Sequence, residues 1–168
     1  MIVSYEFFAP GVPVAKGSAK AFYSKKAGRA FVVQDNDARQ KPFASTITHE
    51  AIAAGIRPCD GPVFVLMRFC FPRPKAHYRG KAMTLRDDAP DIHVNTPDVD
   101  KLVRLVFDAL TGVAWQDDKQ AQIDGAFKRY ATDGEMPGVT VVIRKNATAL
   151  PPQRSGGRQQ QIVGTLED

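Results

Sequence analysis

The run Val63–Phe71 is the feature that most restricts the fold of this chain. Eight of its nine residues are apolar, and it is bounded by Pro62 and Pro72. A short, dense apolar run between such breakers predicts a largely buried strand. Other elements must cover this strand, and a chain of 168 residues is long enough to bury about 70% of its unfolded surface. The length corresponds to about one domain.

Three further segments alternate apolar and polar residues or are rich in residues typical of strands. We expect strands at Ile2–Phe8, Gln122–Ala131 and Gly138–Arg144. The last two are linked by the turn-forming pair Asp133-Gly134, which predicts a closing hairpin or meander.

Two segments have helical periodicity. The spacing of apolar and small residues predicts a helix over about 37–54, ended by Gly55. A second helix is expected over Asp98–Leu110, with Gly112 as its C-terminal cap. Its apolar stripe consists of Leu102, Val103, Val106 and Leu110.

Composition excludes several classes of protein. A hydrophobic fraction of 43% and a charged fraction of 24% are ordinary for a globular chain and argue against disorder. No apolar run approaches the roughly 20 residues of a membrane span, and the first residues lack a signal-peptide pattern. We therefore expect a cytoplasmic protein without a membrane partner. Cys59 and Cys70 lack a nearby cysteine partner, so we interpret both as buried small hydrophobes.

The net charge of +5 is unevenly distributed. Between Asp87 and Asp118 lie eight acids and two bases, a local charge of −6, so the rest of the chain carries +11. Excess positive charge favours a polyanionic partner such as nucleic acid. The clustered acids either hold a hard divalent cation or decorate loops, and charge alone leaves both interpretations open.

Two basic stretches are candidate DNA contacts. Residues 16–41 interleave bases with aromatic side chains, which suits phosphate binding and base stacking, or else a hairpin with a solvated face. Residues 72–86 contain five bases and no acid, and their prolines predict a loop. The candidate DNA-binding residues are Lys16, Lys20, Lys25, Lys26, Arg73, Lys75, Arg79 and Lys81.

Asp98 and Asp100 are the first candidate metal ligands. Pro97 favours an extended approach that becomes helical near Asp100, where the helix dipole stabilises negative charge. In that geometry the two carboxylates either converge on a cation or only cap the helix.

The second acidic pair, Asp117-Asp118, follows the helix after a short turn. A chain that runs back along the helix can return this pair to the level of Asp100, so we expect three or four carboxylates to meet. Such a cluster needs a cation, and its oxygen donors match Mg²⁺, with Mn²⁺ as a substitute. His77 and His93 stand apart in the sequence and are expected to be surface or phosphate-contacting residues.

Three motifs together resemble the signature of the RusA-type Holliday junction resolvases, many of which are encoded by prophages. They are Asp98-x-Asp100, Asp108-Ala-Leu-Thr-Gly112 and Trp115-x-Asp-Asp-x-Gln120. A weaker resemblance covers about residues 1–145, which includes Gly11-x-Pro13-x-x-Lys16 and the loop Phe71-Pro-Arg-Pro-Lys75.

The resemblance implies a magnesium-dependent endonuclease that acts as a homodimer and makes paired nicks at four-way DNA junctions, without a small-molecule cofactor. It places catalytic carboxylates at Asp98, Asp100 and Asp118, with Asp117 as a further metal ligand beside them. The family prototype has a catalytic lysine one helical turn after the second aspartate. Here Arg104 occupies that position, while Lys101 directly follows Asp100. Arg104 stabilises charge on the phosphate, or Lys101 takes over the task.

We expect an α+β fold, a mixed sheet with a few helices on one side, over residues 1–148, followed by a flexible tail over 149–168. Two other functions stay open. One is a non-catalytic DNA-binding protein in which the acids only cap a helix. The other is a metal-dependent nuclease that acts on flaps or forks.

Overall fold

The computed structural model describes residues 2–17, 19–34, 38–81 and 83–146. The predicted tail at 149–168 lies outside these residues. The strands are β1 (Ile2–Pro10), β2 (Ala19–Ser24), β3 (Arg29–Gln34), β4 (Val63–Phe71), β5 (Tyr78–Arg79), β6 (Thr84–Leu85), β7 (Ala121–Tyr130) and β8 (Gly138–Asn146). The helices are α1 (Gln40–Ala53), α2 (Val99–Leu110) and the short 3₁₀ turns η1 (Lys75–His77) and η2 (Asp118–Gln120).

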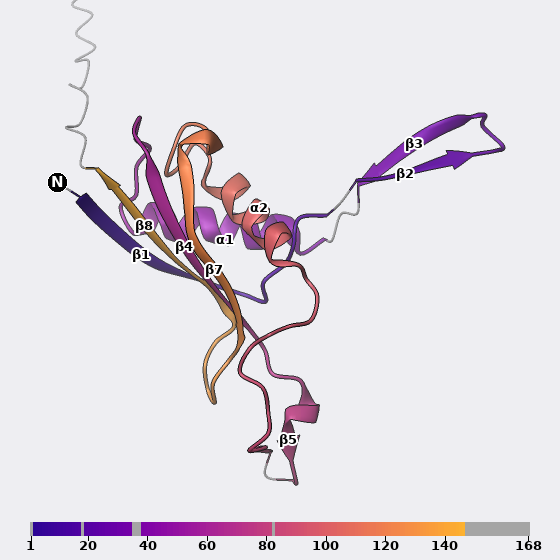
Figure 1. Cartoon of the computed structure of the whole chain (residues 1–168), viewed down its shortest axis with the longest axis vertical. Coiled ribbons are helices and arrows are strands. Elements are labelled where there is room, and N and C mark those ends of the chain that lie inside the picture. Colours follow the sequence, from indigo (N-terminus) through magenta and orange to yellow (C-terminus); the bar gives the residue numbers. More distant parts are fainter. Residues whose placement is uncertain (1, 18, 35–37, 82, 147–168) are drawn as a thin grey trace, which may run out of the picture.

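The centre of the fold is a four-stranded mixed sheet in the order β1-β8-β4-β7. Strands β4 and β7 are parallel, and the other neighbours are antiparallel. Helices α1 and α2 lie together on one face of this sheet (Figure 1). The predicted α+β class is confirmed.

Strand β4 has the predicted bounds and lies inside the sheet. Its residues Val63, Val65, Met67 and Phe69 have no exposed surface. Met67 faces Val141 of β8 on one side and Ala126 of β7 on the other. An interior position buries a dense apolar strand better than an edge position does.

The predicted hairpin between β7 and β8 is wrong. Both strands exist, but β4 lies between them, and each pairs with β4 instead of with the other. The connection from β4 to β7 runs through α2, and a helical crossover of this kind brings the second strand back parallel to the first. Local turn chemistry at Asp133-Gly134 carried no information about this insertion.

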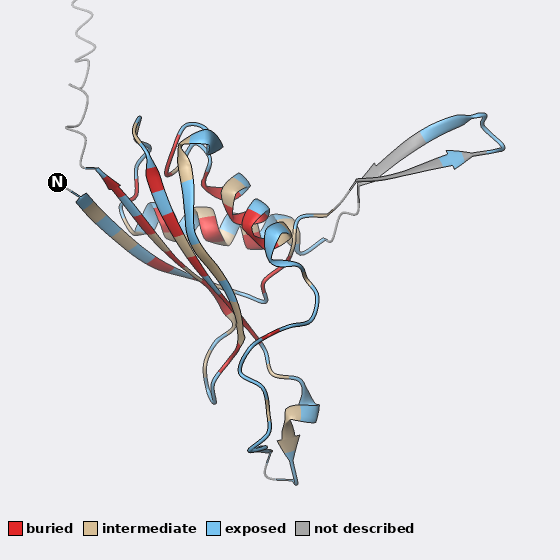
Figure 2. Ribbon diagram, in the orientation of Figure 1, coloured by how far each residue is buried: buried red, intermediate tan, exposed pale blue. Residues whose placement is uncertain are grey.

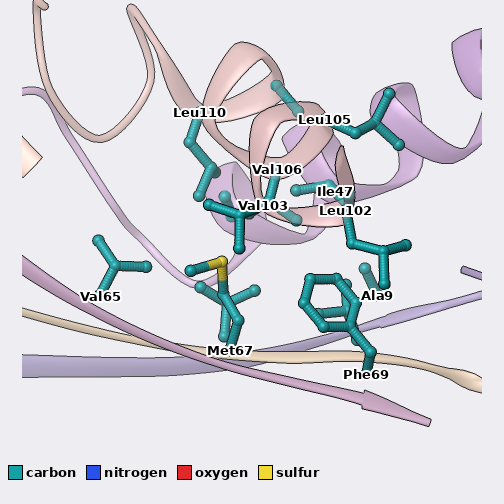
Figure 3. Packing of buried hydrophobic residues seen from close by; sticks show 14 of the residues in the cluster. Ala9, Ile47, Val65, Met67, Phe69, Leu102, Val103, Leu105, Val106 and Leu110 are labelled. Atoms are coloured by element: carbon teal, nitrogen blue, oxygen red, sulfur yellow. The ribbon is translucent and has the colours of Figure 1, made fainter. Parts of the chain in front are cut away.

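The core fills the space between the sheet and the two helices. Ile47 of α1 and Leu102, Val106 and Leu110 of α2 pack over Met67 of β4 (Figure 3). Figure 2 shows buried residues along the strands of the sheet and on the helices that lie over it. Each fully buried aliphatic side chain contributes about 1.5–3 kcal/mol, so this layer fixes the position of α2.

Two arms extend from the body of the protein (Figure 1). The antiparallel pair β2–β3 forms one arm, so residues 19–34 form a hairpin, and phosphate binding by its bases stays a prediction. The segment 72–97 forms the second and contains η1 and the short pair β5–β6, where sequence had indicated only a loop.

Both cysteines are free; Cys70 is buried as expected and Cys59 is half-buried. Within the described residues, no helix has the length and apolar character required to cross a membrane.

Candidate active site

The N-terminus of α2 carries the first two candidate carboxylates. Asp98 precedes the helix in an extended conformation, with φ −67° and ψ 142°, and Asp100 lies in the first turn. The predicted change from extended to helical backbone is therefore confirmed. The Asp98 side chain does not cap the helix but pairs with Lys101, with Oδ2 and Nζ 3.0 Å apart.

Arg104 follows one turn later on the same face as Asp100. Its Nη2 lies 3.8 Å from Asp100 Oδ2, and both side chains are mostly exposed. The two candidate basic side chains thus differ in their partners, since Lys101 pairs with Asp98 and Arg104 pairs with Asp100.

An open hollow of about 450 Å³ lies between α2 and β7. We call it the α2–β7 hollow. Its charged lining residues are Asp100, Arg104, Asp108 and Asp118, and its apolar lining residues are Val99, Val103, Phe107, Ile123 and Ala126. Neither Asp98, Lys101 nor Asp117 lines it.

Asp118 is held firmly at the C-terminal end of α2. Its Oδ1 accepts a hydrogen bond of 2.5 Å from Thr111 Oγ1 and one of 2.9 Å from Trp115 Nε1. Trp115 is fully buried, so the indole N–H that fixes Asp118 is itself fixed by the core. Two donors on one carboxylate hold it in one orientation.

Asp117 caps the turn η2 and does not line the hollow. Its side chain caps η2 by accepting a 3.0 Å bond from the Lys119 backbone N–H, and it pairs with Lys119 Nζ at 3.1 Å. The Gln120 side chain completes the capping box. These contacts, led by the Lys119 backbone N–H, lower the pKa of Asp117. In the structure Asp117 therefore stabilises the turn that presents Asp118.

The expected meeting of all the carboxylates does not occur within one chain. Asp100 lies in the first turn of α2, whereas Asp118 is bonded to Thr111 beyond the last turn. Eleven residues of α-helix correspond to about 16 Å. The described part of the chain holds no group of three or more metal-ligating side chains close enough to share an ion. The turn after α2 is too short to carry Asp118 back along the helix.

The remaining donors still suit a magnesium ion. Mg²⁺ is commonly bound by one or two carboxylates together with substrate phosphate oxygens and water. Asp100 and Asp118 both line the hollow, and the Asp100 side chain is 60% exposed.

Lys16 lies beside this site. Its backbone N–H donates a 3.0 Å bond to the Lys101 carbonyl, and its ammonium group pairs with Asp108. The loop after β1 is thereby attached along α2, at the edge of the α2–β7 hollow.

The predicted DNA contact by Arg73 is corrected. Only 3% of its side chain is exposed, and its guanidinium donates to the Ala131 and Pro90 carbonyls and pairs with Asp91. Arg73 therefore fixes the base of the second arm. Its surroundings arise from three separate segments, which a single sequence does not reveal.

Other predicted basic residues lie on the two arms. Lys75, Arg79 and Lys81 are exposed on the second arm, where Arg79 is 3.5 Å from Asp87. Lys25 and Lys26 are exposed between β2 and β3. The side chain of Lys20 lies outside the described residues.

His93 is not a surface residue as expected, and His77 is half-buried. His93 is 8% exposed and stacks on Phe71 with 4.0 Å between ring centroids, and Tyr130 packs against both His93 and His77. Burial, and then the positive charge of Lys128, lowers the pKa of His93. This aromatic cluster anchors the second arm to the end of the sheet.

Sequence reasoning missed the residues that support the carboxylates. Thr111 and Trp115 donate hydrogen bonds to Asp118. Lys128 donates to the chain directly before Asp98. Thr111 and Trp115 stood within the quoted motifs, but nothing in the pattern around Lys128 distinguishes it from a solvated strand lysine.

Fold and site define a class. An α+β domain with fixed carboxylates, an adjacent arginine and two basic arms is suited to hydrolysis of phosphodiesters in nucleic acid. The family Endodeoxyribonuclease RusA matches residues 10–144, and the chain belongs to this family. The search of curated proteins found no match.

Membership in the family establishes the enzyme class and the kind of substrate. The protein is an endodeoxyribonuclease, a hydrolase that acts on branched DNA at Holliday junctions, and nucleases of this family generally depend on a divalent metal.

Proposed function

We propose that this protein resolves four-way DNA junctions by paired, Mg²⁺-dependent nicks, and that it does so as a homodimer. The observation that carries this proposal is the α2–β7 hollow, in which Asp100, Arg104 and Asp118 line one surface. All three belong to the segment that carries the family signature.

Asp100, with Asp98 next to it, and Asp118, beyond the other end of α2, would each hold an ion together with phosphate oxygens and water, with Mn²⁺ as a substitute ion. A bound divalent cation supplies Lewis-acid polarisation of the phosphate. Asp100 lies in the first turn of α2 beside Arg104, and the Asp118 carboxylate accepts hydrogen bonds from Thr111 and Trp115.

Arg104 would stabilise the additional negative charge that develops on the phosphate during the reaction. It lines the hollow, whereas Lys101 is engaged with Asp98 outside it. Geometry therefore favours Arg104 over Lys101 for this role. Arginine acts here through charge and hydrogen bonds, since it does not release its proton at neutral pH.

The two arms would contact the DNA backbone on either side of the junction. Lys25 and Lys26 at the tip of β2–β3, and Lys75, Arg79 and Lys81 on the second arm, extend positive charge away from the body. Phosphate contacts of this kind position the DNA without reading its sequence.

A homodimer would supply the second nick. A four-way junction has approximate twofold symmetry, and a C2 dimer presents two equivalent sites to two opposed strands. Size-exclusion chromatography with light scattering, alone and with junction DNA, measures this state directly.

The proposal is tested by cleavage of strand-labelled DNA with and without Mg²⁺. Four-way junction, flap, replication fork and linear duplex are compared at equal concentration, and every strand is labelled in turn. We expect Mg²⁺-dependent nicks at symmetric positions in two opposed strands of the junction and little cleavage of duplex. Faster cleavage of flaps or forks than of junctions would instead establish the nuclease of other branched DNA.

A further inference from the structure

Lys128 of β7 connects the sheet to the chain that enters α2. Its Nζ donates a 2.7 Å hydrogen bond to the Asn95 carbonyl and a 2.8 Å bond to the Pro97 carbonyl. These two acceptors lie on the three residues directly before Asp98. A single ammonium group therefore holds the segment 95–97 at two points.

Neighbouring groups of β7 complete this attachment. The Asn95 side-chain amide donates to the Tyr130 hydroxyl at 3.2 Å, and the backbone N–H of His93 donates to the backbone carbonyl of Lys128 at 3.3 Å. Among these contacts, those of Lys128 reach closest to Asp98.

The consequence for the site follows from chain connectivity. The Asp98 carbonyl accepts the first hydrogen bond of α2, from the Leu102 N–H at 3.2 Å, so the start of the helix depends on where residue 97 ends. Asp98 and Asp100 are mostly exposed and have no core packing of their own to fix them. Hydrogen bonds from a charged donor to carbonyls are among the stronger ones in proteins.

We propose that Lys128 is a positioning residue for Asp98 and Asp100, which it places through the Asn95 and Pro97 carbonyls without touching the DNA. This inference rests on the proposed function for the role of the two aspartates. Lys128 lies on β7, and β7 begins directly after η2, the turn that contains Asp118. The same strand therefore follows Asp118 and carries the lysine that holds the chain before Asp98.

The chain offers a matched control in Lys145 of β8. Its ammonium group also donates to a backbone carbonyl, that of Arg57, and only 8% of the residue is exposed. It lies outside the α2–β7 hollow. Lys128→Met and Lys145→Met both remove a partly or fully buried lysine that binds a carbonyl, but only the first touches the segment before Asp98.

The experiment uses the full chain as wild type, Lys128→Met, Lys128→Arg and Lys145→Met. Amide hydrogen exchange followed by mass spectrometry reports on residues 95–102, and calorimetric titration with Mn²⁺ reports on the carboxylates. Thermal unfolding measures the general loss of stability, and junction binding in EDTA measures direct DNA contact.

We expect Lys128→Met to speed exchange in 95–102 and to weaken Mn²⁺ binding about 10–100-fold, the usual effect of losing a residue that orients a ligand. Lys128→Arg should restore part of both, Lys145→Met should change neither, and junction binding in EDTA should stay as in the wild type.

Unchanged exchange in 95–102, or equal effects of the two methionine variants on Mn²⁺ binding, would overturn the inference. A loss of junction affinity in EDTA by Lys128→Met would identify Lys128 as a phosphate contact instead. A wild type that neither binds Mn²⁺ nor cleaves junctions would refute the proposed function, whereas the exchange measurement tests the attachment by Lys128 independently.

Discussion

At the scale of single residues, the paired aspartates Asp117 and Asp118 show how neighbours acquire different tasks. Asp117 faces the backbone of its own turn and caps it, whereas Asp118 is held by Thr111 and Trp115 at the hollow. Their order in the sequence follows from the capping box, which needs its acid at the first position and Gln120 three residues later.

This difference predicts unequal effects of substitution. Asp98→Asn, Asp100→Asn and Asp118→Asn should each abolish cleavage while leaving junction binding intact or stronger, because each loses metal affinity but also a repulsion of phosphate. Asp117→Asn should be mild, since asparagine also caps helices, and Asp117→Ala should lower the stability of the fold because it removes the cap of η2. Cleavage assays, gel-shift titrations and denaturant unfolding measure the three quantities. Wild-type cleavage in all of the first three variants would remove these residues from the site.

A second set of substitutions tests whether Arg104 or Lys101 stabilises the charge on the phosphate. Arg104→Lys should keep most activity, and Arg104→Ala should lose about 2.7–4 kcal/mol of transition-state stabilisation, the loss typical of a deleted charge-stabilising donor. Lys101→Ala should have a smaller effect, because Lys101 pairs with Asp98 and does not line the hollow. Single-turnover rates distinguish the two, and a larger loss in Lys101→Ala would reverse the assignment.

Spacing and motif made Asp98, Asp100 and Asp118 candidate site residues, because such signals are local, and their role stays a prediction. The burial of Arg73 and His93 and the bonds of Lys128 were not predicted, since each depends on segments separated by more than 15 residues in the chain.

At the scale of elements, patterns that depend on one segment were reliable and pairings were not. The bounds of β4 and the apolar stripe of α2 agree with the sequence because periodicity reports which side of an element is buried. The order β1-β8-β4-β7 was missed because it depends on competition between strands for the interior of the sheet.

The attachment of the second arm should depend on pH. His93 is buried against Phe71 and Tyr130, and its pKa lies below the ordinary 6.5. The unfolded chain therefore binds a proton at His93 more readily, so stability should fall as pH decreases below about 6.5 and change little above it. Glu135, whose pKa is lowered to about 2 mainly by Arg129, acts in a separate window below about 4.5.

Denaturant unfolding between pH 7.5 and 5 measures this dependence. His93→Phe, which keeps an aromatic ring, should flatten the curve. An equal slope in wild type and His93→Phe would show that another group titrates.

At the scale of the whole molecule, positive arms surround an acidic site. Under the proposed function, phosphate approaches Asp100 and Asp118, and the exposed bases of the arms supply the attraction that offsets the repulsion of DNA by these carboxylates. The acids between residues 87 and 118 are divided in the structure. Asp87, Asp88 and Asp91 lie on the second arm beside arginines, and the other five lie at α2 and η2.

The arms should therefore govern the salt dependence of binding. Replacing Lys75 and Arg79 by alanine should weaken binding to junction and duplex alike and reduce the slope of log K against log salt by about 0.9 per lost contact. Arg73→Ala should instead destabilise the arm, because Arg73 binds carbonyls at its base. An unchanged slope in the double variant would place this arm away from the DNA.

The account rests on the claim that the α2–β7 hollow is where the phosphodiester is cut. The most direct test is the single-turnover rate of junction cleavage in Mg²⁺ by the wild type, Asp100→Asn and Asp133→Asn, the last an exposed aspartate in the β7–β8 connection. We predict that Asp100→Asn binds the junction but does not nick it, while Asp133→Asn cleaves as fast as the wild type. Cleavage by Asp100→Asn at the wild-type rate would contradict the account.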